Sequence, residues 1–143
     1  MTEKQNLEPG LPPLLPQTKE VMDTLMASEL IQKALKLAVD QDQQCLEEQI
    51  AITEIPSSPF GEELRAADFE KRFKELGLEN VHIDEVGNVI GSRPGVGPEP
   101  RTKLVIAAHL DTVFAKDSNF KVRREGNCYY APSIGDDSRG LAA

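Results

Sequence analysis

The feature that most constrains this chain is a short apolar run followed directly by a histidine and an aspartate. Residues 104–108 read Leu-Val-Ile-Ala-Ala, and His109-Leu110-Asp111 comes next. A run of this length, with no polar alternation, predicts a buried β-strand over residues 103–108. Because the chemistry of α/β proteins gathers where such strands end, His109 and Asp111 are candidate site residues.

The spacing of these two residues suits a metal ligand supported by a carboxylate. Along an extended backbone, residues i and i+2 point to the same side, so Asp111 can reach one ring nitrogen of His109. Such a contact sets the tautomer and leaves the other nitrogen for a metal ion. A His-x-Asp pair is a weak pattern by itself, and its place at the end of an apolar run strengthens it.

A pair of carboxylates follows further along the chain. Asp136 and Asp137 lie between Gly135 and Gly140, just before a pattern that starts a helix. Glycines permit close backbone approach, so one of these acids can reach a metal that His109 also holds. Histidine with carboxylates and no thiolate suits Zn²⁺, Mn²⁺ or Co²⁺. Since a catalytic zinc ordinarily needs three protein ligands, we expect the site in this chain to be incomplete.

The remaining pattern predicts helices that alternate with short strands. Helical spacing begins at Thr18. We expect helices over residues 29–38 with Ser28 as the cap, from a cap at Asp40 or Asp42 to Pro56, and over residues 62–76 with Gly77 as the stop. We expect short strands over residues 81–84, 88–91 and 120–123, and an extended approach at residues 128–130. This order predicts an α/β fold with helices packed on a mixed sheet.

Within the helix over residues 62–76, the apolar side chains are expected to share one inner face. They are Leu64, Ala67, Phe69, Phe73 and Leu76. His82 alternates with apolar neighbours and is expected to be a surface histidine.

Composition and charge exclude several classes of protein. The net charge of −8, from 16 basic and 24 acidic residues, argues against nucleic acid and anionic membranes as partners. No apolar run approaches the roughly 20 residues of a membrane span, and the N-terminus does not resemble a signal peptide. Cys45 and Cys128 lie far apart without metal-binding neighbours, so we expect two free thiols and a cytoplasmic protein. Residues 1–17 are rich in proline and are expected to form a flexible tail before a domain over residues 18–143.

At this point two stretches together resemble a known family. His-Leu-Asp-Thr-Val at residues 109–113, with Gly-Asp-Asp-Ser-Arg-Gly-Leu-Ala at residues 135–142, is similar to the M20 metallopeptidases. This group contains tripeptidase (peptidase T), carboxypeptidase G and acetylornithine deacetylase. Residues 52–57, 61–66 and 84–91 agree, and the likeness spans about residues 37–143. Ser133 departs from the pattern, because glycine is common at that place.

The resemblance implies that the chain is the truncated N-terminal part of a zinc-peptidase catalytic domain of the phosphorylase/hydrolase-like fold. His109 would bind one zinc ion of a pair, and Asp111 would act as a catalytic residue that supports it. Asp136 would bridge both metals, with Asp137 as the less favoured alternative. The family often has a cis peptide after the bridging aspartate, which would place one between Asp136 and Asp137.

The expected function is therefore hydrolysis of amide or peptide bonds by a metallopeptidase, using water activated by a dinuclear zinc site. This chain would supply only part of that site, since no downstream glutamate base and no later ligands follow Ala143. The substrate would be a peptide or, if the enzyme is a deacylase, an N-acyl amino acid. The full-length protein could form a homodimer.

Two other functions stay open. The chain could be a catalytically incomplete fragment that acts as a non-enzymatic interaction or metal-binding piece. It could also bind Mg²⁺ for phosphate chemistry, although no phosphate-cradling glycine loop precedes a helix in the required form. A sheet with an uncovered edge further predicts a chain that is marginally stable or prone to aggregate by itself.

Overall fold

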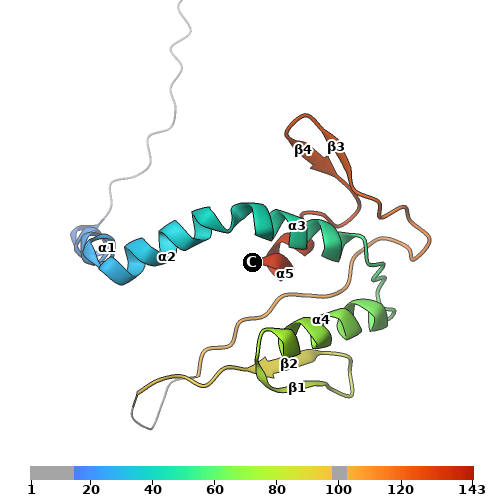
Figure 1. The fold of residues 1–143 in the computed structure, drawn as a ribbon, viewed down its shortest axis with the longest axis horizontal. Helices are drawn as coiled ribbons and strands as arrows, with labels where there is room; N and C mark the ends of the chain where they lie inside the picture. The colour runs from blue at the N-terminus through green and yellow to red at the C-terminus, as the bar shows by residue number, and fades with distance from the viewer. Residues whose placement is uncertain (1–14, 98–102) are drawn as a thin grey trace, which may run out of the picture. The chain divides into compact units, whose positions relative to one another are not determined.

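The computed structural model describes residues 15–97 and 103–143 (Figure 1). The chain divides into two compact units, Met1–Asp42 and Gln43–Ala143. Most of the predicted proline-rich tail, residues 1–14, lies outside the described residues. Pro16 and Gln17 already belong to a helix, because proline is favoured at the first helical position, where its missing N–H leaves no bond unmade.

The described part of the first unit is a pair of helices, α1 (Pro16–Ala27) and α2 (Glu29–Asp40). Ser28 separates them and stands at the N-cap of α2, as predicted, but its side chain makes no capping hydrogen bond. Neither helix buries a residue. Leu30 and Val39, for example, are 74% and 75% exposed. The two helices therefore contribute little burial of apolar surface to stability.

The second unit carries the rest of the secondary structure. Its elements are α3 (Asp42–Thr53), which starts at the boundary, α4 (Glu63–Glu75), β1 (Glu79–Ile83), β2 (Val89–Ser92), β3 (Arg123–Glu125), β4 (Cys128–Tyr130) and α5 (Ser138–Ala142). The mixture of helices and strands confirms the predicted α/β class. Among the described residues, however, the strands pair as two separate antiparallel sheets, β1–β2 and β3–β4, and not as one mixed sheet.

The most regular part is a helix followed by a hairpin. Helix α4 packs on β1 and β2 (Figure 1). Gly77 has a φ of 72°, so the predicted left-handed stop after the helix is confirmed. The turn between β1 and β2 also lies at the predicted place. Cys45 and Cys128 are both free. None of the described helices is long and apolar enough to cross a membrane.

The core of the second unit is small and partly polar. Its buried hydrophobic residues, among those described, are Ile52, Ala66, Phe69 and Phe120. Helix α4 turns Arg65, Ala66 and Phe69 inward. Leu64 and Leu76 are 58% and 67% exposed and Ala67 is exposed too, so the predicted inner face of this helix was wrong at those three positions. The buried face instead includes an arginine, whose guanidinium finds backbone carbonyl partners inside the fold.

The predicted buried strand over residues 103–108 is also wrong. These residues form no strand (Figure 1). Leu104, Val105 and Ile106 are 84%, 84% and 89% exposed. A strand that is apolar on both faces needs neighbouring strands and covering helices, and no described residue pairs with this run. The predicted strand over residues 120–123 differs as well, since β3 begins only at Arg123.

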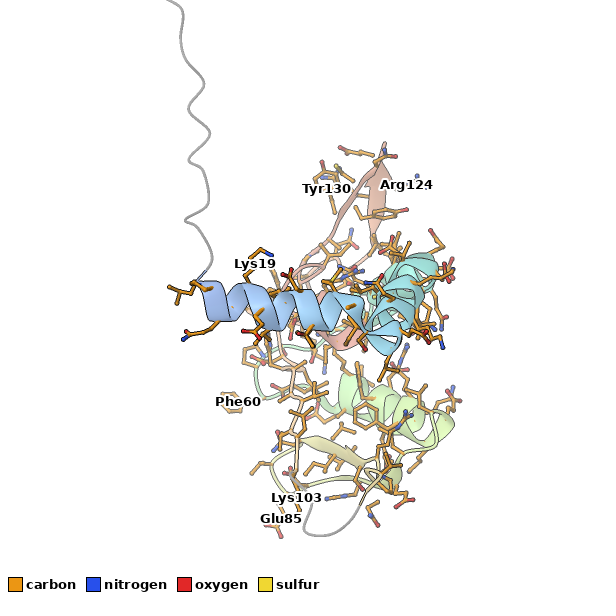
Figure 2. All side chains as sticks on the ribbon, turned by 90° about the vertical axis from the view of Figure 1, so that its left-hand side faces the viewer. Lys19, Phe60, Glu85, Lys103, Arg124 and Tyr130 are labelled. Carbon is orange, nitrogen blue, oxygen red and sulfur yellow. The ribbon has the colours of Figure 1, made fainter. Side chains whose placement is uncertain are left out.

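The end of α3 holds the chain that leads into β3. Glu54 accepts hydrogen bonds from Lys121 Nζ at 2.8 Å and from the Val122 amide at 3.1 Å. The bond from Lys121 is the largest of the influences that lower the pKa of Glu54. Beyond this contact, Arg124 and Tyr130 stand on the β3–β4 hairpin (Figure 2).

The loop before α4 contains a residue in an unfavourable conformation. Phe60 has a φ of 60°, and its ring is 99% exposed (Figure 2). A bulky side chain in the left-handed region costs about 1 kcal/mol or more. We therefore expect Phe60→Gly to raise the free energy of unfolding by about 1 kcal/mol, measured by urea denaturation.

The matched control for this prediction is Phe60→Ala, which removes the same exposed ring and keeps the strained backbone. It is expected to leave the free energy of unfolding unchanged or slightly lower. The amide of Phe60 donates to Glu62 Oε1, and both variants keep that bond. An equal gain in the two variants would show that ring exposure, not the backbone, is responsible.

Candidate metal centre

The segment that carries His109 and Asp111 is held by the loop after α3, although it forms no strand. The amide of Thr112 donates to Ser57 O at 2.8 Å. The guanidinium of Arg65 donates to Leu110 O at 2.7 Å. Thr112, Ser57 and Arg65 are all buried. These contacts hold the residues next to the histidine and the aspartate against the core of the second unit.

The segment that carries Asp136 is held by α3 itself. Gln49 Nε2 donates to Ile134 O, and Cys45 Sγ lies 3.4 Å from Ala142 O. The peptide bond between Asp136 and Asp137 is cis, as the family resemblance implies. Both ligand-bearing segments therefore dock on α3 and the loop that follows it.

The two segments meet at His109. Its Nε2 lies 2.9 Å from Asp136 Oδ1. Its Nδ1 lies 3.0 Å from Asp111 O and 3.1 Å from Asp111 Oδ1. The contact between His109 and Asp111 is the one that the His-x-Asp spacing predicts. The structure thus brings together the imidazole and two of the three predicted carboxylates.

Asp137 is occupied elsewhere. Its side chain accepts a hydrogen bond from the Gly140 amide at 3.0 Å, which makes it the N-cap of α5. Aspartate is a favoured residue at this position, because its carboxylate satisfies an amide that has no partner inside the helix. Asp137 therefore caps α5, whereas the side chain of Asp136 faces His109.

The electrostatics of the site favour a charged imidazole. The hydrogen bond to Asp136 is the largest influence and, with the contacts to Asp111, it raises the pKa of His109 above its ordinary value. The side chains of His109 and Asp136 are 48% and 87% exposed, so water weakens the effect. Burial lowers the pKa of Arg65, while the nearby charge of Asp111 acts in the opposite direction.

The donor atoms fit half of a metal site. Two ligand atoms at about 2.0 Å from a tetrahedral zinc ion lie about 3.3 Å from each other. His109 Nε2 and Asp136 Oδ1 are 2.9 Å apart, so a shift of a few tenths of an ångström would admit an ion between them. Within residues 15–97 and 103–143, no three or more His, Cys, Asp or Glu side chains are grouped to hold a metal. The pair therefore needs ligands from elsewhere to make a catalytic centre.

Two features of the second unit lie outside this site. His82 is exposed, and its Nδ1 contacts Asn80 O, so it takes no part. A hollow of about 410 Å³ near the β3–β4 hairpin is lined by residues that include Lys121, Arg123 and Tyr130. None of the predicted site residues lines it. The side chains of His109, Asp111 and Asp136 are 48%, 44% and 87% exposed, so the candidate metal centre is an open surface site.

Sequence reasoning missed the two side chains that position the ligand segments, Gln49 and Arg65. A charged residue in a helix usually belongs to the solvated face, so its residue type alone does not indicate that Arg65 is buried. One signal was available. Arg65 lies four residues before Phe69, so the two side chains must share a face of α4, and that face is buried.

The raised pKa of His109 gives a prediction for Asp136→Asn. Removing the charge of Asp136 is expected to lower the pKa of His109, which a pH titration of the imidazole NMR signals would measure. Because the pKa is raised in the folded chain, protonated His109 stabilises the fold below the ordinary histidine pKa. This contribution to the free energy of unfolding is lost as the pH rises through the raised pKa of His109. Over the same pH interval, Asp136→Asn should lose less stability than the wild type. An unchanged pKa in the variant would contradict the assigned contact.

Comparison with known proteins relates the chain to a hydrolase. No family model matches it. Over 87 residues, 60% of this chain, it is 38% identical to a protein of Pyrococcus abyssi (strain GE5 / Orsay) described as a LysW-lysine/LysW-ornithine hydrolase. The match covers 23% of that relative's length, so most of the relative lies outside it.

Proposed function

We propose that this chain is part of a metal-dependent hydrolase of amide or peptide bonds, of the M20 type, in which His109 and Asp136 are zinc ligands. The observation that carries the proposal is the 2.9 Å approach of His109 Nε2 to Asp136 Oδ1, from segments far apart in sequence. The similarity to a hydrolase supports it. The presence of two carboxylates and no thiol at this place favours a catalytic over a structural metal.

Each residue at the site has a task that its contacts support. With zinc bound, Asp111 would accept a hydrogen bond from Nδ1–H of His109, which would leave the lone pair of Nε2 for the metal. Asp136 would offer its carboxylate to the metal from a side chain that is 87% exposed. Bound zinc supplies Lewis-acid chemistry, which polarises the carbonyl of the scissile amide.

We further propose that the remaining ligands and the general base come from polypeptide that corresponds to the unmatched part of the relative. A dinuclear site needs more donors than these two residues provide. The exposure of Asp136, 87% of its side chain, leaves room for such ligands to approach. Peptides and N-acyl amino acids are the two substrate classes to compare. The relative's name adds conjugates of lysine and ornithine to the assay.

The test uses the full product of the reading frame that encodes this chain. Hydrolysis of peptide and N-acyl amino-acid substrates should be lost on treatment with a chelator and restored by Zn²⁺, Co²⁺ or Mn²⁺. Activity with one substrate class and not the other decides between peptidase and deacylase. A product that binds no metal and hydrolyses neither class would overturn the proposal and leave the non-enzymatic alternative.

A further inference from the structure

We propose that Arg65 is a positioning residue, which holds Leu110 and thereby keeps His109 and Asp111 in the geometry that brings the imidazole to Asp136. The inference deepens the proposed function, on which only its metal-binding readout rests. Arg65 would not touch the metal. It would act through the backbone of residues 109–111, which we call the ligand segment.

The contacts of Arg65 join two segments that are distant in sequence. Its NH1 donates to Leu110 O at 2.7 Å, and its NH2 donates to Ile55 O at 2.8 Å. The guanidinium group is planar and rigid, so its two terminal nitrogens hold these two carbonyls at a set separation. Ile55 belongs to the loop after α3, which also receives the Thr112 amide at Ser57 O. The ligand segment is therefore tied to that loop on both sides of Asp111.

The position of Leu110 makes this tie relevant to the site. Leu110 lies between His109 and Asp111, so a shift of its carbonyl changes the orientation of both neighbouring side chains. Residues 104–106, a few positions earlier, are 84% to 89% exposed, so burial of their side chains does not hold the segment. The positive charge of Arg65 also attracts Asp111, which holds Nδ1 of the imidazole.

The burial of Arg65 suggests more than a contribution to stability. Its side chain is fully buried, and its Nε has no hydrogen-bond partner within the described part of the chain. A buried cation with one unsatisfied nitrogen is a poor way to stabilise a core, since an apolar side chain of similar size often does as well. The burial of Arg65 is better explained by a role in fixing the local geometry of the backbone that it binds.

Arg72 offers a matched control on the same helix. Its Nε donates to Asp68 and its NH1 to Glu48 on α3, and its side chain is 24% exposed. It therefore also joins α4 to the α3 region, and its loss should reduce stability. Its side-chain hydrogen bonds within the described part of the chain go to Asp68 and Glu48 and not to residues 109–111. Arg65→Gln and Arg72→Gln remove the same charge from one helix, and only the first removes the tie to Leu110.

The experiment compares Arg65→Gln, Arg65→Lys and Arg72→Gln in the full chain. The first readout needs no metal: the ¹⁵N shifts of the His109 ring at a pH where the ring is neutral. We expect both Arg65 variants to move these shifts towards those of free histidine and Arg72→Gln to leave them unchanged. The second readout is Zn²⁺ affinity by calorimetry, which should fall about 10- to 100-fold in Arg65→Gln and stay unchanged in Arg72→Gln.

The outcomes separate the two proposals. Unchanged ring shifts in the Arg65 variants, or equal changes in Arg72→Gln, would overturn the positioning role. If Arg65→Gln does not fold, Arg65→Lys decides, because a lysine can keep one carbonyl bond and not both. If the wild-type chain binds no zinc, the proposed hydrolase site fails, while the ring shifts still report whether Arg65 positions His109.

Discussion

Replacing Asp136 by asparagine is expected to lower kcat/KM for amide hydrolysis by at least about 100-fold in the full product of the reading frame. The reason is the loss of a ligand: even residues that only support metal ligands change affinity or activity by about 10- to 100-fold. Asp136 lies 2.9 Å from His109 Nε2, and an asparagine there cannot supply the negative charge. Steady-state kinetics with saturating zinc would measure the effect.

The matched control is Asp137→Asn, one residue away. The Asp137 side chain caps α5 through the Gly140 amide, and asparagine is an equally good capping residue. Its activity should stay within a few fold of the wild type, and its stability should be nearly unchanged. The opposite pattern, with Asp137→Asn inactive and Asp136→Asn active, would assign the metal ligand to Asp137 and reverse the account of this pair.

Phe69→Ala is expected to lower the free energy of unfolding by about 3–4 kcal/mol. Phe69 is 6% exposed, and it is one of the few buried hydrophobic side chains among the described residues. Its ring meets Phe73 edge to face with centroids 6.0 Å apart, and the Arg72 guanidinium lies over it at the same distance. The variant would lose these contacts and leave a cavity. Urea denaturation followed by circular dichroism would measure the loss.

Leu64→Ala on the same helix is the control. Leu64 is 58% exposed, so its truncation is expected to cost less than about 1 kcal/mol. This pair of variants tests which face of α4 is buried, since the sequence pattern placed both residues on the inner face. A loss for Leu64→Ala as large as that for Phe69→Ala would show that the helix is rotated.

Local signals in the sequence predicted local structure well. Gly77 marks the end of α4, and the turn between β1 and β2 follows from residues 85–87 and the alternating runs on either side. These elements form within a few residues of each other and depend on short-range sterics. The spacing of His109 and Asp111 was informative for the same reason, because a contact between residues i and i+2 is also local.

Long-range packing was not predictable in the same way. Residues 104–106 have the composition of a central strand, yet a strand of that kind exists only where other strands flank it. Their exposure is consistent with the expectation that the chain is marginally stable or prone to aggregate, which stays a prediction. Arg65 was missed because its two carbonyl partners, on Ile55 and Leu110, are set by tertiary structure.

The most direct test of the account is the ¹⁵N spectrum of the His109 ring as Zn²⁺ is added to the chain. We expect the Nε2 signal to move on zinc binding while Nδ1 keeps its proton against Asp111, and we expect Asp136→Asn to weaken this change. No movement of the Nε2 signal at saturating zinc, or coordination through Nδ1, would contradict the assignment of His109 and Asp136 as a pair of metal ligands.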